Sequence, residues 1–161
     1  MNDKLLFQET QYSPGSLILA LVVTALFSTA VIYLLRIKNT SFRIAALFTG
    51  LVGLFILSIA CTLRLKTFYY TDGVSYQFVS VFSAPYEQVA MDTVIKAEVV
   101  TYNPADYGGW GMKHSGNDTA LAYSTSGNKG LLLRFKNGKK LLLGTQKPDN
   151  LAFAIKQYYP H

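Results

Sequence analysis

The residues best placed to bind a ligand lie around the dipeptide Asn137-Gly138, where basic side chains are frequent. Residues 131–136 and 139–143 flank it and read as strands. Asn-Gly is a strong signal for a two-residue hairpin turn in which both residues have a positive φ. Because side chains alternate between the faces of a strand, such a turn places three cations on one face of the hairpin. These are Arg134, Lys136 and Lys139.

A cationic hairpin of this kind has three interpretations. The charges can keep a strand edge soluble, contact anionic lipid headgroups, or recognise another protein. Each Lys or Arg near an anionic bilayer contributes about 1 kcal/mol of binding free energy. A chain that is already anchored in a membrane needs no lipid affinity to reach it. We therefore favour recognition of another protein, or orientation of the domain, over targeting to lipid, and keep anionic-lipid sensing as the alternative.

Groupings of residues typical of catalysis are missing from the sequence. The histidines are His114 and His161, and the one cysteine, Cys61, lies in an apolar segment where a thiolate is disfavoured. A cysteine-based zinc site is excluded. Motifs for nucleotide phosphates, serine hydrolases and zinc proteases do not occur. We expect a non-catalytic protein without cofactor or metal, while an enzyme with an unrecognised site stays open.

Composition favours a membrane protein and argues against nucleic acid as a partner. Of the 161 residues, 15% are charged and 50% are hydrophobic, whereas soluble domains carry about 25% charged residues. The net charge is +6, but residues 67–161 contain nine Lys or Arg and seven Asp or Glu. That balance is far from the basic footprint of a protein that binds nucleic-acid phosphates.

Two uncharged apolar segments, residues 16–35 and 44–63, account for the excess hydrophobicity. At ~1.5 Å per residue, a helix of this length reaches ~30 Å, the thickness of the hydrocarbon core of a bilayer. Basic residues bracket both segments, and the connection between them is short. We therefore expect an antiparallel transmembrane hairpin.

Small residues recur every four positions along both predicted spans. Such ridges let two helix backbones approach closely in lipid, so we predict that the spans pack along them. The residues concerned are Ala20, Thr24 and Ser28 in the first span, and Ala45, Thr49 and Gly53 in the second.

The segment from Thr67 to His161 alternates apolar and polar residues and predicts a small β domain. Residues 1–66 are then the N-terminal segment and the hairpin. About seven short strands are expected, two of them joined at Asp72-Gly73 by another two-residue turn. Apolar spacing after Pro148 predicts a helix over residues 148–159. The fold class is α+β: a transmembrane hairpin, then a bent sheet or split barrel closed by a C-terminal helix.

This order of elements and several short runs resemble membrane-anchored bacterial pleckstrin-homology-like proteins of uncharacterised function. The resemblance covers residues 67–159 and implies a seven-stranded pleckstrin-homology-like β-barrel with a C-terminal helix. It implies no catalytic residues, and in such proteins the domain is expected in the cytoplasm. The runs are Gly109 to Met112, Ala122-Tyr123, Gly130 to Leu133, Asn137 to Lys140 and, most specific, Gly144 to Pro148.

Flanking charges do not decide which side of the membrane carries the domain. The connection between the spans contains three Lys or Arg, and the other side also contains three. The first span alone, with three against one, favours an external domain. The resemblance favours the cytoplasm, which we adopt. We expect a two-span inner-membrane protein whose β domain binds a protein partner or a second copy of itself.

Overall fold

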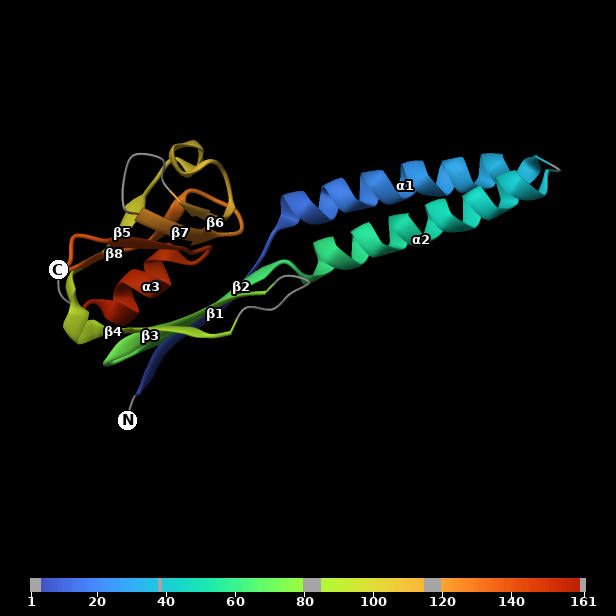
Figure 1. Ribbon diagram of the computed structural model, residues 1–161. Helices are drawn as coiled ribbons and strands as arrows, with labels where there is room; N and C mark the ends of the chain where they lie inside the picture. Colours follow the sequence, from blue (N-terminus) through green and yellow to red (C-terminus); the bar gives the residue numbers. More distant parts are fainter. Residues whose placement is uncertain (1–3, 38, 80–84, 115–119, 160–161) are drawn as a thin grey trace. The chain divides into compact units, whose positions relative to one another are not determined.

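The computed structural model describes residues 4–37, 39–79, 85–114 and 120–159. The chain divides into two compact units, one of residues 13–63 and one of residues 1–12 together with 64–161. Figure 1 shows the first unit as two long helices and the second as strands with one short helix. His161 and the side chain of Cys61 lie outside the described residues.

The first unit consists of helices α1 (Pro14–Arg36) and α2 (Thr40–Thr62), each of 23 residues. Both are long and apolar enough to cross a membrane. The predicted spans lie almost wholly within them. Side-chain oxygens of Ser13 and Asn39 accept hydrogen bonds from backbone N–H groups and so cap the two N-termini.

Small residues lie where α1 packs on α2. Ala20 is 2% exposed, and a Cβ added to the buried Gly53 would lie 3.1 Å from the Cβ of Phe27. On α2 the ridge differs from the prediction, because Ala46 is fully buried and Ala45 is exposed. Neighbouring helical residues point about 100° apart, so a shift of one residue changes the face. Of the other predicted positions, Thr24 and Thr49 are half-buried and Ser28 is exposed.

The second unit contains two β-sheets. The first is antiparallel, with the strand order β1-β2-β3-β4. The second has the order β5-β8-β9-β7-β6, with β7 and β9 parallel. Short 3-10 turns, Met91–Thr93 and Pro104–Tyr107, follow β4 and β5. The strands are β1 (Leu5–Tyr12), β2 (Arg64–Tyr70), β3 (Gly73–Val79), β4 (Glu87–Ala90), β5 (Val94–Thr101), β6 (Gly111–His114), β7 (Ala120–Ser124), β8 (Lys129–Phe135) and β9 (Lys140–Gly144).

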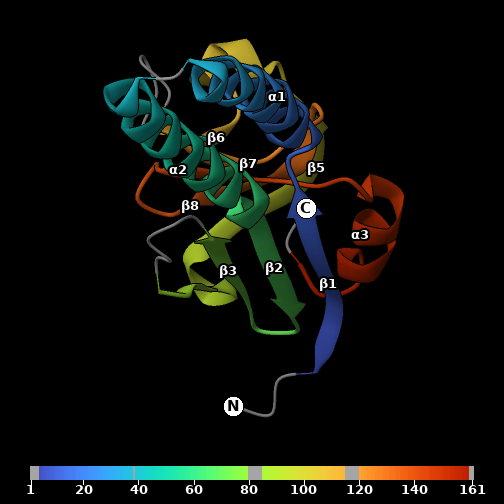
Figure 2. The ribbon, with the colours of Figure 1, turned by 90° about the vertical axis from the view of Figure 1, so that its right-hand side faces the viewer.

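The two sheets share one apolar core, and helix α3 (Pro148–Ile155) closes one side of it. Leu65 from the first sheet, Leu133 from the second and Leu151 from α3 belong to the same buried cluster. The helix contacts β1 and β5, which are edge strands, and Figure 2 shows it beside β1. The α+β class with a C-terminal helix is confirmed. The described strands form no closed barrel, because β4 and β5 are consecutive in the chain but lie in different sheets.

Strand β1 precedes the helices and was not expected from the sequence. It pairs with β2 from Leu5↔Tyr70 to Tyr12↔Arg64, so the domain includes residues that the sequence analysis assigned to the N-terminal segment. A single residue separates β1 from α1, and a single residue separates α2 from β2. The helical pair is therefore inserted between two paired strands.

The turn at Asn137-Gly138 has three residues instead of two. The Phe135 N–H donates to the Lys139 carbonyl at 3.0 Å, and the Gly138 N–H donates to the Phe135 carbonyl at 3.0 Å. Of these loop residues only Gly138 has a positive φ, 79°. This geometry is a type I turn followed by a left-handed residue, the other common solution for a hairpin.

The turn at Asp72-Gly73 also differs from the prediction, since neither residue has a positive φ. Gly73 is needed for another reason. A Cβ at this position would lie 2.6 Å from the Val89 carbonyl oxygen of the neighbouring strand β4. The glycine permits close strand approach and does not set the turn.

A buried carboxylate on β1 ties this strand to the second sheet. Glu9 is 6% exposed and accepts hydrogen bonds from the Thr145 hydroxyl (2.7 Å) and the Gln146 N–H (2.9 Å). The side-chain amide of Gln11 donates to the Gly144 carbonyl. Gly144, Thr145 and Gln146 of the run Gly144 to Pro148 therefore each form a hydrogen bond with β1.

Replacing Glu9 by Ala should destabilise the domain, because the Thr145 hydroxyl and the Gln146 N–H lose their acceptor. An unsatisfied buried group costs about 1–3 kcal/mol. Thr145 is buried and Gln146 is exposed, so we expect the free energy of unfolding to fall by about 1–3 kcal/mol. Glu9→Gln, which keeps an acceptor oxygen, should cost less. Thermal unfolding of the full chain in detergent measures the loss against Gln8→Ala, at the exposed neighbouring position. Equal stability of all variants would show that the network does not hold β1.

Candidate binding site

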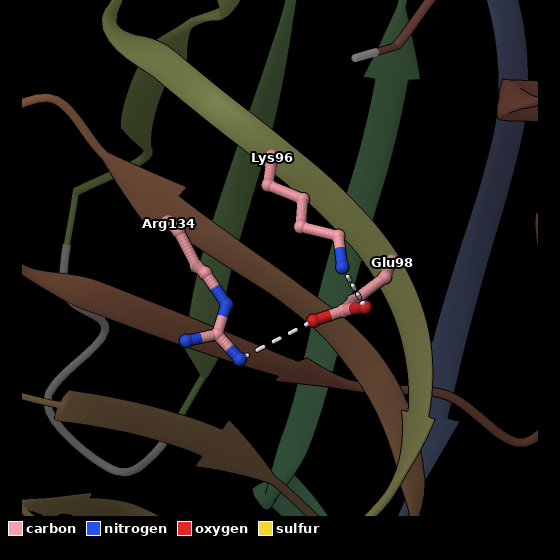
Figure 3. Close-up of polar contacts among 3 residues, drawn as sticks. All are labelled: Lys96, Glu98 and Arg134. Atoms are coloured by element: carbon pink, nitrogen blue, oxygen red, sulfur yellow. Dashed lines mark hydrogen bonds and ion pairs between the residues drawn. The ribbon is translucent and has the colours of Figure 1, made fainter. Parts of the chain in front are cut away.

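The three cations predicted to share one face have different surroundings in the structure. Arg134 of β8 contacts Glu98 of β5, with 3.3 Å between a guanidinium nitrogen and a carboxylate oxygen. Lys96 binds the other oxygen of that carboxylate at 2.8 Å (Figure 3). Lys96, and after it Arg134, hold the pKa of the Glu98 carboxyl below its usual range. Arg134 is therefore engaged within its own sheet.

Lys136 and Lys139 are exposed on and beside the β8–β9 loop. Lys136 lines a shallow hollow with Asp92, whereas Lys139 lines a separate groove. The three-residue loop causes this separation. It pairs Arg134 with Lys140, whereas a two-residue loop would pair Arg134 with Leu141. Directly paired residues share a face of the sheet, so Lys139, next to Lys140, lies on the other face from Arg134. The expectation of one shared cationic face is corrected accordingly.

The groove beside Lys139 lies between the two sheets, where β4 and β6 are the edge strands. Its volume is about 540 Å³. Charged or titratable side chains come from three strands and the loop, and apolar side chains lie between them. An apolar surface with a few polar groups around it is typical of a binding site. The apolar residues are Val89, Leu121, Phe135 and Leu141, and the charged or titratable ones are Glu87, His114, Lys139 and Lys140.

Two tyrosines hold the carboxylate of this groove. The Tyr76 hydroxyl donates to one oxygen of Glu87, and the Tyr123 hydroxyl donates to the other at 3.1 Å. The ring centroids are 4.8 Å apart. Burial and then the Glu87 charge raise the pKa of Tyr123 to about 12, and burial also raises the pKa of Tyr76. At neutral pH both tyrosines are donors, so the cluster fixes the carboxylate and offers no tyrosine base.

This cluster was missed in the sequence analysis because its members are far apart in the chain. Alternation in residues 73–79 places Tyr76 on the core face, but nothing local relates it to Glu87 or Tyr123. His114 is exposed and lines the groove. Within the described part of the chain, no three His, Cys, Asp or Glu residues could together hold a metal ion.

The raised pKa of Tyr123 predicts a loss of stability in alkali. Between the ordinary tyrosine pKa of about 10 and the folded value of about 12, the unfolded chain releases this proton and the folded chain retains it. Stability is therefore present below pH ~10 and falls as the pH rises toward 12. Tyr123→Phe should show a smaller drop in unfolding temperature between pH 9 and pH 11. An unchanged drop would contradict the assignment.

Comparisons with known proteins return no match to this chain among protein families, curated proteins or solved structures. The resemblance to pleckstrin-homology-like proteins stays a prediction.

Proposed function

We propose that this chain is an inner-membrane protein whose β domain binds an acidic, partly apolar segment of a protein partner in the groove beside Lys139. The partner is another protein or a second copy of the chain. The groove itself carries the proposal, because it combines an edge strand, apolar side chains and the exposed cation of Lys139. No catalytic step is part of the proposal.

Membrane insertion is supported by the surface of the helices. Large apolar side chains along both helices are exposed, for example Leu26 at 66% and Phe48 at 70%. Monomeric soluble proteins rarely expose contiguous apolar patches of more than a few hundred Å². A bilayer would cover these side chains without any other protein.

The charges of the groove favour an acidic segment. Its lining contains two lysines and one carboxylate, and Lys139 is exposed at its rim. Strand β4 is the last strand of its sheet among the described residues, and an exposed edge can pair with an extended segment. Side chains of that segment would reach Val89, Leu121 and Phe135.

Anionic-lipid sensing has less support. The first residue of β8, Lys129, accepts from the Thr145 N–H, and the adjacent Gln146 donates to the carbonyl of Tyr12, from which the chain passes to α1. The loop with Lys136 lies at the other end of β8, about 20 Å away for a seven-residue strand. Arg134 is in addition paired with Glu98, which leaves fewer cations of the predicted face available to anionic headgroups.

Photo-crosslinking in native membranes tests the groove. A photoreactive residue in place of Gln88, an exposed groove residue, should give one discrete protein adduct. Lys139→Glu should reduce its yield about five- to tenfold, as expected for the loss of ~1 kcal/mol from a reversed rim charge. Lys129→Glu makes the same charge change at the far end of β8 and should leave the yield unchanged.

The mass of the adduct distinguishes the possible partners. Twice the mass of the chain identifies a second copy, and any other protein mass identifies a different partner. Adducts with lipid alone would support the lipid alternative and reject protein recognition. A protein adduct that is insensitive to Lys139→Glu would show that the groove is not the binding site.

The cytoplasmic location of the domain is tested by labelling a cysteine with a membrane-impermeant maleimide. In a Cys61→Ala chain, Asn137→Cys at the exposed hairpin loop should react only after the cells are broken. Thr40→Cys, at the start of α2, should react on intact cells, because the two sites then lie on opposite sides of the bilayer. The reverse pattern would place the domain outside. Reaction of both sites on intact cells would contradict membrane spanning.

A further inference from the structure

Trp110 is exposed although it is the one tryptophan of the chain. Its side chain is 54% exposed, and Met112, two residues further along, is 57% exposed. The indole Nε1–H donates to the Gly127 carbonyl at 2.8 Å, which holds the ring in place. The polar atom of the ring is thus satisfied, while much of its apolar surface is left open.

Hydrogen bonds place Trp110 at the end of the domain through which the chain passes to the helices. Gly127 follows Ser126, whose hydroxyl accepts from the Gln146 amide at 2.7 Å. The same amide donates to the Tyr12 carbonyl at 3.0 Å. Tyr12 is the last residue of β1 and is separated from α1 by Ser13 alone. The peptide unit before Gly127 and the side chains of Ser126 and Gln146 therefore connect the Trp110 bond to the last residue of β1.

The residues at this end have the composition of a membrane interface. Tyr12 is 50% exposed, and its cross-strand partner is the basic residue Arg64. Tryptophan and tyrosine concentrate at the headgroup level of bilayers, where an amphipathic ring meets both water and lipid, and Arg and Lys accompany them. An exposed indole whose N–H is already hydrogen-bonded to the protein fits this environment.

We propose that Trp110 anchors the β domain to the bilayer surface, with its ring in the headgroup layer. This proposal rests on the membrane insertion of the proposed function. It requires no particular protein partner. The anchor would limit the angle between the domain and the membrane.

The single tryptophan makes the test direct. The full chain is reconstituted in phosphatidylcholine vesicles, and Trp110 fluorescence is quenched either by lipids with a nitroxide near the headgroup or by aqueous iodide. We expect strong quenching by the nitroxide lipid and weak quenching by iodide. The control chain carries Trp110→Phe and Tyr158→Trp. Position 158 adjoins Tyr159, whose hydroxyl donates to the Tyr70 and Gly73 carbonyls at the opposite end of the first sheet. Its tryptophan should be quenched severalfold more by iodide than Trp110 and hardly by the lipid.

Flotation of the vesicles after an alkaline wash distinguishes a failure of membrane insertion from a failure of the Trp110 anchor alone. A chain that washes off rejects membrane insertion and the anchor together. A chain that stays, with Trp110 quenched by iodide as strongly as the control tryptophan, rejects the anchor alone. Protection of Trp110 from both quenchers would show that protein covers the ring, which also rejects the lipid anchor.

Discussion

The pairing of β1 with β2 determines how the two units of this chain are connected. The strands lie on either side of the helical pair in the sequence, yet Tyr12 and Arg64 are direct cross-strand partners. Only one residue lies at each connection between strand and helix. The end of β1 and the start of β2 therefore keep the first residue of α1 close to the last residue of α2. The helices must then form a hairpin. The aromatic and charged residues Tyr12 and Arg64 lie side by side at these strand ends.

Two carboxylates show how the same side-chain type serves two purposes in a two-sheet domain. Glu9 lies inside, where its hydrogen bonds from Thr145 and Gln146 join the first sheet to the second. Glu87 lies at the side that α3 does not cover, where tyrosine hydroxyls hold it at a groove. Glu9 links the two sheets through its side chain, where a closed barrel would link them through paired strands. Glu87 lies at the groove between the two sheets.

Much of the secondary structure could be predicted because alternation and turn residues are local signals. The strands after residue 67 and the final helix follow from them, as does the helical pair from its length and apolarity. Strand β1 was missed because its eight residues precede an apolar segment and pair with a strand beyond it. The hairpin register failed because Asn-Gly suits both a two-residue loop and a three-residue loop, and this choice separates Arg134, Lys136 and Lys139. The groove needed residues from six strands, which no local pattern connects.

The discontinuous domain imposes an order on its own synthesis. Strand β1 is made before the helices, but the Gln146 side chain that binds its last residue follows 134 residues later. At about 5–20 residues per second, β1 waits roughly 7–27 s for that partner. During this interval Glu9 lacks its partners Thr145 and Gln146, and β1 can pair with β2 only after both helices have been made. A chaperone or the translocation machinery would therefore encounter β1 before its partner strand exists.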